Sequence, residues 1–362
     1  MHLETKNRRA FQRLQEAQLS LTAFKQSKKR MELEKAGQKL TEALNLDPNY
    51  LRAVYYRGLV RDMLGNPKEA IGDFRLVLDQ RPPFVPEVKY NLAIATFHQY
   101  GFKNLSNAVE QFKEVINSTE EPALEVRARA AVAHAYAVMM IPQPGKTDDC
   151  QAINEFLASD NAREHVEKYY RLSKIQTDQV TYEIESGNLD PDTQHEIRWR
   201  LGNTRAVQRM FYTDYFDENR IEKLLEGEQA LIEADLLNPR NWSLYCNRAS
   251  TYMRLGHWIK RTKKDENSKR QAEEYFGKAI EILNEVINDL LPNYGFALYE
   301  KGRVYRLWGN FDEAFVWLRK ALDITENRAV GDTTLKCELQ RVELESTDYP
   351  YLSPDAFENP AT

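Results

Sequence analysis

Few residues in this chain have the types and spacing that catalysis needs. The segment Gly145-Lys146-Thr147 matches the end of a phosphate-binding loop, but Met140 stands where that motif requires its first glycine. No histidine stands at a zinc-ligand spacing from cysteine or carboxylate residues, and no cysteine–histidine pair has the context of a nucleophile. The sequence therefore predicts a protein that is not an enzyme and that binds no metal or cofactor.

A run of positive charge between residues 260 and 270 is suited to binding an anion. Asp265 and Glu266 dilute this run, and the whole chain has a net charge of −5 and a pI of about 5.9. We interpret it as the solvated tip of a hairpin, with contact to an anion or to RNA as the alternative. Its basic residues are Lys260, Arg261, Lys263, Lys264, Lys269 and Arg270.

The cysteines and the hydropathy of the chain bear on its compartment. Cys150, Cys246 and Cys337 are odd in number and far apart, which argues against a disulfide framework. The first residues lack the apolar core of a secretory signal, and no apolar run approaches the roughly 20 residues of a membrane span. We therefore expect a protein of the reducing cytoplasm without a membrane partner.

The elements that would position these residues are helices that recur at a fixed period. Ala36 and Leu40 reappear 34 residues later as Ala70 and Phe74, a period typical of stacked supersecondary units. Gly58 stands where the first helix of a pair would pass close to the second, so that only a small side chain fits. Because strand signals are nearly absent, the sequence predicts an all-α fold.

The last copy carries the pattern most completely, with Leu298, Gly302 and Tyr305 followed by Ala314 and Leu318. This pattern resembles the tetratricopeptide repeat, whose first helix holds Leu, a small residue and Tyr, and whose second holds Ala and a large residue. The resemblance extends over residues 7–328. It implies a right-handed α-solenoid of about seven helix-turn-helix hairpins with an irregular middle unit.

The phase of the repeats also suggests how the chain is divided. The sixth hairpin should be longer than its neighbours, because 53 residues separate Pro239 from Pro292 where 34 would be regular. The expected segments are an N-terminal block of about three repeats (1–119), an irregular helical insertion (120–190), a C-terminal block of about three repeats (191–328), a capping helix (329–345) and a flexible tail (346–362).

The resemblance further implies a binding groove, since the first helices of successive repeats line the concave face of such an array. Aromatic side chains interspersed with arginine have the composition of protein interface hot spots. The residues assigned to this groove are Arg52, Tyr55, Leu59, Tyr90, Ile94, Phe97, Trp199, Asn203, Asn247, Met253, Tyr299, Arg303 and Arg306.

One subgroup of the family grips the terminal carboxylate of a peptide with paired asparagines and basic residues. Asn203 and Asn247 match the two asparagine positions. Trp199, Phe296 and Glu300 stand at the basic positions, so the charge that would neutralise a carboxylate is missing. Binding of a chaperone's C-terminal tail is therefore not expected, whereas a peptide held by its backbone and apolar side chains remains open.

The sequence thus favours a non-enzymatic scaffold or adaptor that binds a peptide segment or a partner subunit in the groove. One alternative is a regulatory subunit of a larger effector-enzyme or nucleoprotein complex. The other alternative is RNA contact through the basic tip at 260–270. Neither the partner nor the oligomeric state can be predicted from these residues.

Overall fold

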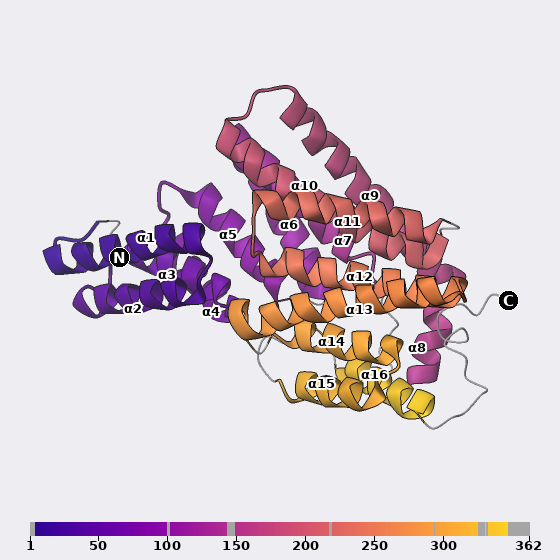
Figure 1. The fold of residues 1–362 in the computed structure, drawn as a ribbon. Coiled ribbons are helices and arrows are strands. Elements are labelled where there is room, and N and C mark those ends of the chain that lie inside the picture. The colour runs from indigo at the N-terminus through magenta and orange to yellow at the C-terminus, as the bar shows by residue number, and fades with distance from the viewer. Residues whose placement is uncertain are drawn as a thin grey trace. The chain divides into compact units, whose positions relative to one another are not determined.

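The computed structural model describes residues 4–99, 102–142, 149–216, 219–292, 294–324, 330 and 332–346. Every regular element among these residues is helical, which confirms the predicted all-α fold (Figure 1). The segment Gly145–Thr147 and the expected tail beyond residue 346 lie outside the described residues. The helices are α1 (Arg8–Ser27), α2 (Arg30–Leu46), α3 (Leu51–Met63), α4 (Pro67–Leu78), α5 (Val85–His98), α6 (Phe102–Ser118), α7 (Pro122–Val138), α8 (Cys150–Leu157), α9 (Asp160–Glu185), α10 (Pro191–Phe216), α11 (Arg220–Leu237), α12 (Trp242–Thr262), α13 (Glu266–Glu285) with a π-helical extension η1 (Val286–Leu290), α14 (Gly295–Trp308), α15 (Phe311–Asp323) and α16 (Asp332–Ser346).

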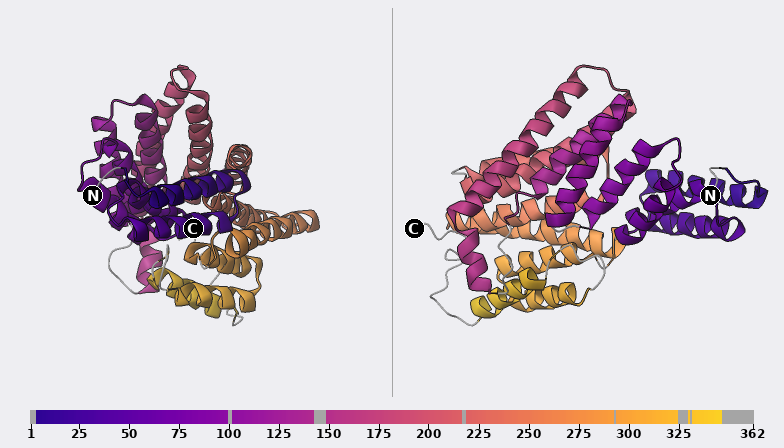
Figure 2. Two further views of the ribbon diagram at one scale, coloured as in Figure 1. Left: turned by 90° about the vertical axis from the view of Figure 1, so that its left-hand side faces the viewer. Right: turned by 180° about the vertical axis from the view of Figure 1, so that it is seen from behind.

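Consecutive helices pack against each other as hairpins, which Figures 1 and 2 show clearly for α1 with α2 and for α12 with α13. The other pairs of this kind are α3 with α4, α5 with α6, α10 with α11, and α14 with α15. The chain forms two compact units. One comprises Met1–Val132 and Asp289–Pro292, and the other comprises Ala133–Asn288 and Asn293–Thr362.

The two helices of a hairpin cross so closely that the crossing residue has no room for a side chain. A Cβ atom at Gly58 on α3 would lie 2.8 Å from Cε1 of Phe74 on α4. A Cβ atom at Gly302 on α14 would lie 2.6 Å from Cγ of Leu318 on α15. Phe74 and Leu318 are both fully buried. The small and large residues that recur in the sequence are therefore the residues that meet at these crossings.

The hairpin of α12 and α13 is longer than the one that follows it. Its helices have 21 and 20 residues, against 14 and 13 in α14 and α15. Ala272, Phe276, Ala279 and Leu283 on α13 are all buried, so the small–large alternation continues along the extra length.

The cysteines require a correction. Cys150 on α8 and Cys337 on α16 form a disulfide, with their Cα atoms 5.4 Å apart although 187 residues separate them in sequence. The sequence argued against disulfides because the cysteines are distant and odd in number. The fold returns α16 to the side of α8, and the odd cysteine is Cys246, which is buried on α12. Burial raises the pKa of the Cys246 thiol.

Helix α14 also buries a cation against α15. Lys301 is only 5% exposed, and its Nζ donates a hydrogen bond to Oδ1 of Asn284 at 2.6 Å. The same Nζ lies 3.3 Å from the centroid of the Trp317 ring, which partly offsets the loss of hydration. Burial nevertheless lowers the pKa of Lys301 to about 8. The protonated side chain is therefore a net cost to the folded state at neutral pH.

Substitution at a helix crossing tests the packing. Gly58→Leu should lower the free energy of unfolding by about 1–3 kcal/mol, because Phe74 leaves no space for the new side chain. Gly72→Ala on α4 is the matched control, since a Cβ there meets no atom within 4 Å. The control should be stabilising by about 0.5–1 kcal/mol through its higher helix propensity. Urea denaturation measures both, and equal effects of the two substitutions would contradict the close crossing.

The buried lysine predicts a pH dependence. Between the folded pKa of about 8 and the ordinary value of 10.5, the unfolded chain binds more protons at Lys301 than the folded chain does. This group therefore makes wild-type stability rise with pH across that window, by about 1–3 kcal/mol, and Lys301→Met abolishes the rise. The measurement is urea denaturation of both proteins at pH 7 and pH 10. Lys320→Met, which removes an exposed cation from the same tryptophan, is the control, and parallel behaviour of wild type and Lys301→Met would refute the prediction.

Candidate protein-binding face

In the N-terminal unit, polar side chains join the first helices of neighbouring hairpins. Nδ2 of Asn91 on α5 donates a hydrogen bond to the Tyr55 hydroxyl on α3 at 2.9 Å. Further along the same two helices, Nδ1 of His98 lies 2.9 Å from Oδ1 of Asp62. Burial raises the pKa of Tyr55 to about 12, so the hydroxyl stays protonated and can donate a hydrogen bond of its own.

The C-terminal unit repeats this arrangement on α10, α12 and α14. Nδ2 of Asn247 on α12 donates to Oδ1 of Asn203 on α10 at 2.8 Å. The Ser250 hydroxyl on α12 donates to Oε2 of Glu300 on α14 at 2.5 Å. Asn203, Ser250 and Glu300 are buried, so these bonds satisfy polar groups that water does not reach. They also fix the spacing and register of the three first helices.

The predicted groove residues differ in how much of them a partner could touch. Arg52 is exposed, and it lies 3.0 Å from a carboxylate oxygen of Glu4. Tyr55, Leu59, Ile94, Trp199, Asn247 and Arg303 are partly exposed. Tyr90, Phe97, Asn203, Met253, Tyr299 and Arg306 are buried and pack within their own units. Contact with a partner stays a prediction for the whole set.

Two of the predicted groove arginines on α14 are engaged by the chain's own helices. Nε of Arg306 lies 3.0 Å from Oε2 of Glu338, and its Nη1 donates to Oε1 of Glu345 at 2.6 Å, both on α16. Nη1 of Arg303 donates to Oε1 of Glu300 at 2.9 Å. The sequence predicted α16 as a cap from its apolar stripe. It gave no sign that the acidic residues of that helix would bind these arginines.

Some basic residues of the run at 260–270 are bound by other parts of the chain, and others are exposed. Lys260 lies in the last turn of α12, and its Nζ donates to the backbone carbonyls of Leu307 and Trp308 at 3.1 and 3.0 Å. It therefore binds the C-terminus of α14, where carbonyl groups and the helix dipole favour a cation. Lys269 forms an exposed ion pair with Glu266 at 2.6 Å.

One of the remaining basic residues of this run, Lys263, borders an open hollow of about 910 Å³ between the start of α11 and the end of α12. The guanidinium carbon of Arg220 lies 4.2 Å above the ring centroid of Trp258, and that of Arg261 lies 5.0 Å from it. Lys263 lines the hollow, and Lys264 is exposed beside it. Arg270 is exposed on α13.

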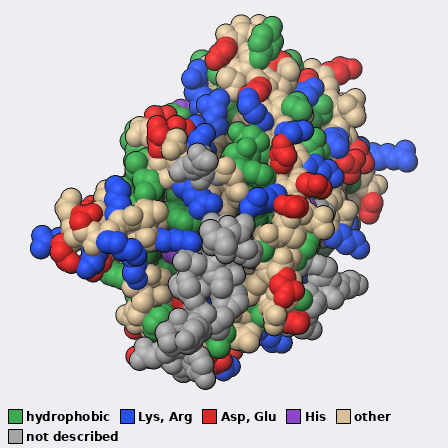
Figure 3. Space-filling view, turned by 90° about the vertical axis from the view of Figure 1, so that its right-hand side faces the viewer, with side chains coloured by type: hydrophobic (Ala, Val, Ile, Leu, Met, Phe, Trp, Pro, Cys, Tyr) green, Lys and Arg blue, Asp and Glu red, His purple; other side chains and the backbone are tan. Residues whose placement is uncertain are grey.

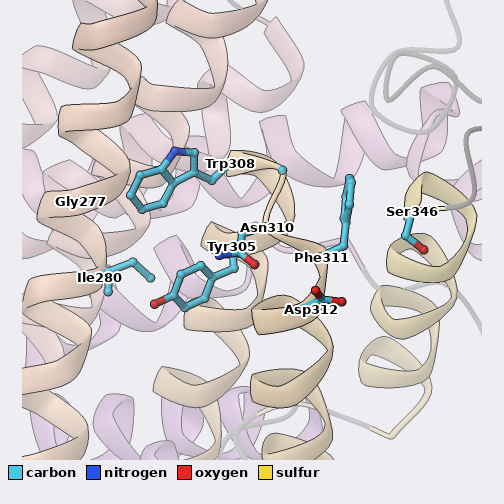
Figure 4. Close-up of a pocket in the computed structure, with 9 residues that line it drawn as sticks. Gly277, Ile280, Tyr305, Trp308, Asn310, Phe311, Asp312 and Ser346 are labelled. Carbon is cyan, nitrogen blue, oxygen red and sulfur yellow. The ribbon is translucent and has the colours of Figure 1, made fainter.

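A second hollow, of about 810 Å³, lies between α13, the turn from α14 to α15, and the end of α16. Figure 4 shows Tyr305 and Trp308 on one side of it, with Ile280 of α13 facing the Tyr305 ring. Phe311 and Ser346 border its other end. This hollow could not be predicted from the sequence, because its lining comes from four helices that only the tertiary structure brings together.

Other classes of site find no support in the described part of the chain. No group of three or more His, Cys, Asp or Glu side chains there could hold a metal ion. None of the helices described combines the length and the apolar character needed to cross a bilayer. On the face drawn in Figure 3, Lys and Arg side chains intermingle with Asp and Glu, so this face has no broad area of a single charge.

Comparison with known proteins gives one family match. Residues 266–327, from α13 to just beyond α15, match the model of the tetratricopeptide repeat. No curated protein matches the chain.

Several solved structures resemble the chain at low sequence identity. A tetratricopeptide repeat protein from Parabacteroides merdae is 13% identical, with 92% of this chain and 99% of that chain covered and a TM-score of 0.43. Human IFIT1, in a dimer with m7Gppp-AAAA, is 16% identical, with 95% and 78% covered and a TM-score of 0.44. The TPR2AB domain of yeast Sti1, in its pHSP90 complex, is 14% identical, with 93% and 98% covered and a TM-score of 0.29.

The family match falls on the hairpin whose sequence pattern is most complete. The glycine crossings and the paired helices extend that pattern into the N-terminal unit. The match over residues 266–327 and this packing identify tetratricopeptide repeats in that part of the chain.

Proposed function

We propose that the chain is a non-enzymatic scaffold that binds a peptide segment or a partner subunit along its first helices. Proteins built from this repeat generally serve as protein-interaction scaffolds. The observation that carries the proposal is the row of bridged first helices in the C-terminal unit, where Asn203 and Asn247 hold α10 against α12 at 2.8 Å.

Partly exposed side chains on that row have the chemistry of an interface. Trp199 stands one turn before Asn203 on α10, and the guanidinium carbon of Arg200 lies 4.8 Å from its ring centroid. Asn247 keeps its carbonyl oxygen for a partner's backbone amide, since its Nδ2 is bonded to Asn203. A tryptophan held against rigid helices gives large contact area at little entropic cost.

The geometry favours a protein partner over RNA. Lys260 is bonded to the end of α14 and Lys269 is paired with Glu266, so both positive charges are partly balanced within the chain. Only a few exposed cations remain at the tip, and affinity for a nucleic acid rises with the number of phosphates neutralised. Affinity capture with the full chain distinguishes the kinds of protein partner. It recovers either a client protein that carries a bound peptide segment or a stoichiometric enzyme or nucleoprotein complex.

Truncation of the partly exposed tryptophan tests the proposed face. Trp199→Ala should weaken binding of the captured partner at least about tenfold in a titration, because interface tryptophans are commonly hot spots. Tyr182→Ala on α9 is the matched control, since it removes a ring that is 67% exposed and lies outside the proposed face. Circular dichroism checks that both variants keep their helices. Equal affinity of the two variants would exclude Trp199 from the interface.

The basic tip gives a separate prediction. Changing Lys263, Lys264 and Arg270 to Glu together should leave binding of the protein partner unchanged within about twofold, because exposed charges away from an interface contribute little. Fluorescence anisotropy with a single-stranded RNA should detect no specific binding by the wild-type chain. Salt-dependent RNA binding that the triple variant loses would instead support a nucleic-acid function.

A further inference from the structure

Helix α8 packs lightly against α9, which follows it in the chain, and is linked to α16 by side chains. It has eight residues, and Asn154 is its only buried residue. Cys150 is bonded to Cys337, and one turn later Oδ1 of Asn154 accepts a hydrogen bond from Nη2 of Arg341 at 2.5 Å. Helices of this length are marginal in water without tertiary contacts. Besides its contact with α9, α8 is therefore held by these two anchors, and Cys337 and Arg341 also stand one turn apart on α16.

Helix α16 has a separate attachment that does not involve α8. Leu335, Leu339 and Val342 are buried in the hydrophobic cluster with α14 and α15. Glu338 and Glu345 bind Arg306 of α14 at 3.0 and 2.6 Å. Cleavage of the disulfide therefore removes a main anchor of α8 and leaves the packing of α16 in place.

The two sulfur atoms differ in their access to solvent. Cys150 is partly exposed, whereas Cys337 is 5% exposed. A dithiol reductant can therefore attack Sγ of Cys150 as its thiolate, which breaks the bond to Cys337 and releases the Cys337 thiolate to take up a proton. The second thiol of the reductant then displaces Cys150 as a thiol and closes its own disulfide. Two electrons and two protons pass from the reductant to the protein.

We propose that the Cys150–Cys337 disulfide is a redox-cleavable clasp that holds α8 against α16. Its reduction by a dithiol releases α8 and uncovers the face of α16 that carries Cys337 and Arg341. Both side chains are largely covered in the disulfide-bonded form, with the Arg341 side chain 15% exposed. The redox state of one cysteine pair thereby determines whether this face of α16 is exposed to solvent. This inference does not depend on the proposed peptide-binding function.

Hydrogen exchange of the full chain tests the clasp. The disulfide is first allowed to form in air, and half of the sample is treated with dithiothreitol. Reduction should speed exchange of the α8 amides by about tenfold or more, with less than about a twofold change in α14 and α15, since local opening is independent of the rest of the unit. Cys150→Ser should reproduce the fast exchange without reductant, and dithiothreitol should not change it further. Cys246→Ala should behave as wild type in both conditions.

Three outcomes of thiol labelling and hydrogen exchange would contradict the proposal. Native air-oxidised protein that takes up a maleimide at both Cys150 and Cys337 has no clasp. Equal α8 exchange with and without reductant shows a disulfide that does not hold the helix. Fast exchange throughout α14, α15 and α16 after reduction shows general unfolding in place of local release.

Discussion

The close crossing of the two helices in each hairpin is the constraint on which the rest of the structure depends. Gly58 faces Phe74, and Gly302 faces Leu318, at distances that exclude even one added carbon. A large side chain from the second helix then fills the space over the backbone of the first, so these two hairpins bury a ring and a branched chain at their centres. Because this contact sets the angle and separation of the helices, it also sets which of their faces remain available to the next hairpin.

Polar bridges act at the next level, between hairpins. Apolar packing positions neighbouring first helices only approximately, since it has no direction. The bonds Asn91–Tyr55 in one unit and Asn247–Asn203 in the other supply direction, because a hydrogen bond forms only when its donor and acceptor are aligned. The first helices are therefore held in register along the face that we propose as the binding surface.

The end of the array is closed by ions and a covalent bond. Buried Arg306 is neutralised by Glu338 and Glu345, and α16 in turn is joined to α8 through Cys337. A buried guanidinium without such partners would be strongly destabilising. The ion pairs therefore explain how Arg306, which the sequence assigned to the groove, can be charged and buried. The disulfide also removes one of the grounds for expecting a reducing compartment, since such bonds persist mainly in oxidising ones.

The sequence by itself determined the local features of this protein. The 34-residue spacing of small and large residues predicted the helix pairs, and the apolar stripe Leu335, Leu339 and Val342 predicted the capping helix, because both patterns follow from a helical period within one or two elements. The candidate site was only partly predictable. Tyr55 and Trp199 remain partly exposed, but Met253 and Tyr299 are buried, since exposure depends on neighbouring hairpins that a repeat pattern does not describe.

Only the tertiary structure decided the contacts between distant segments. Cys150 and Cys337 are 187 residues apart, and Lys260 binds carbonyl groups at the end of α14, in the next hairpin along the chain. Such pairings carry no local period, because they arise from the accumulated packing of all the helices between them. The chemical type of each side chain could be read from the sequence, and the tertiary fold determined which residue it contacts.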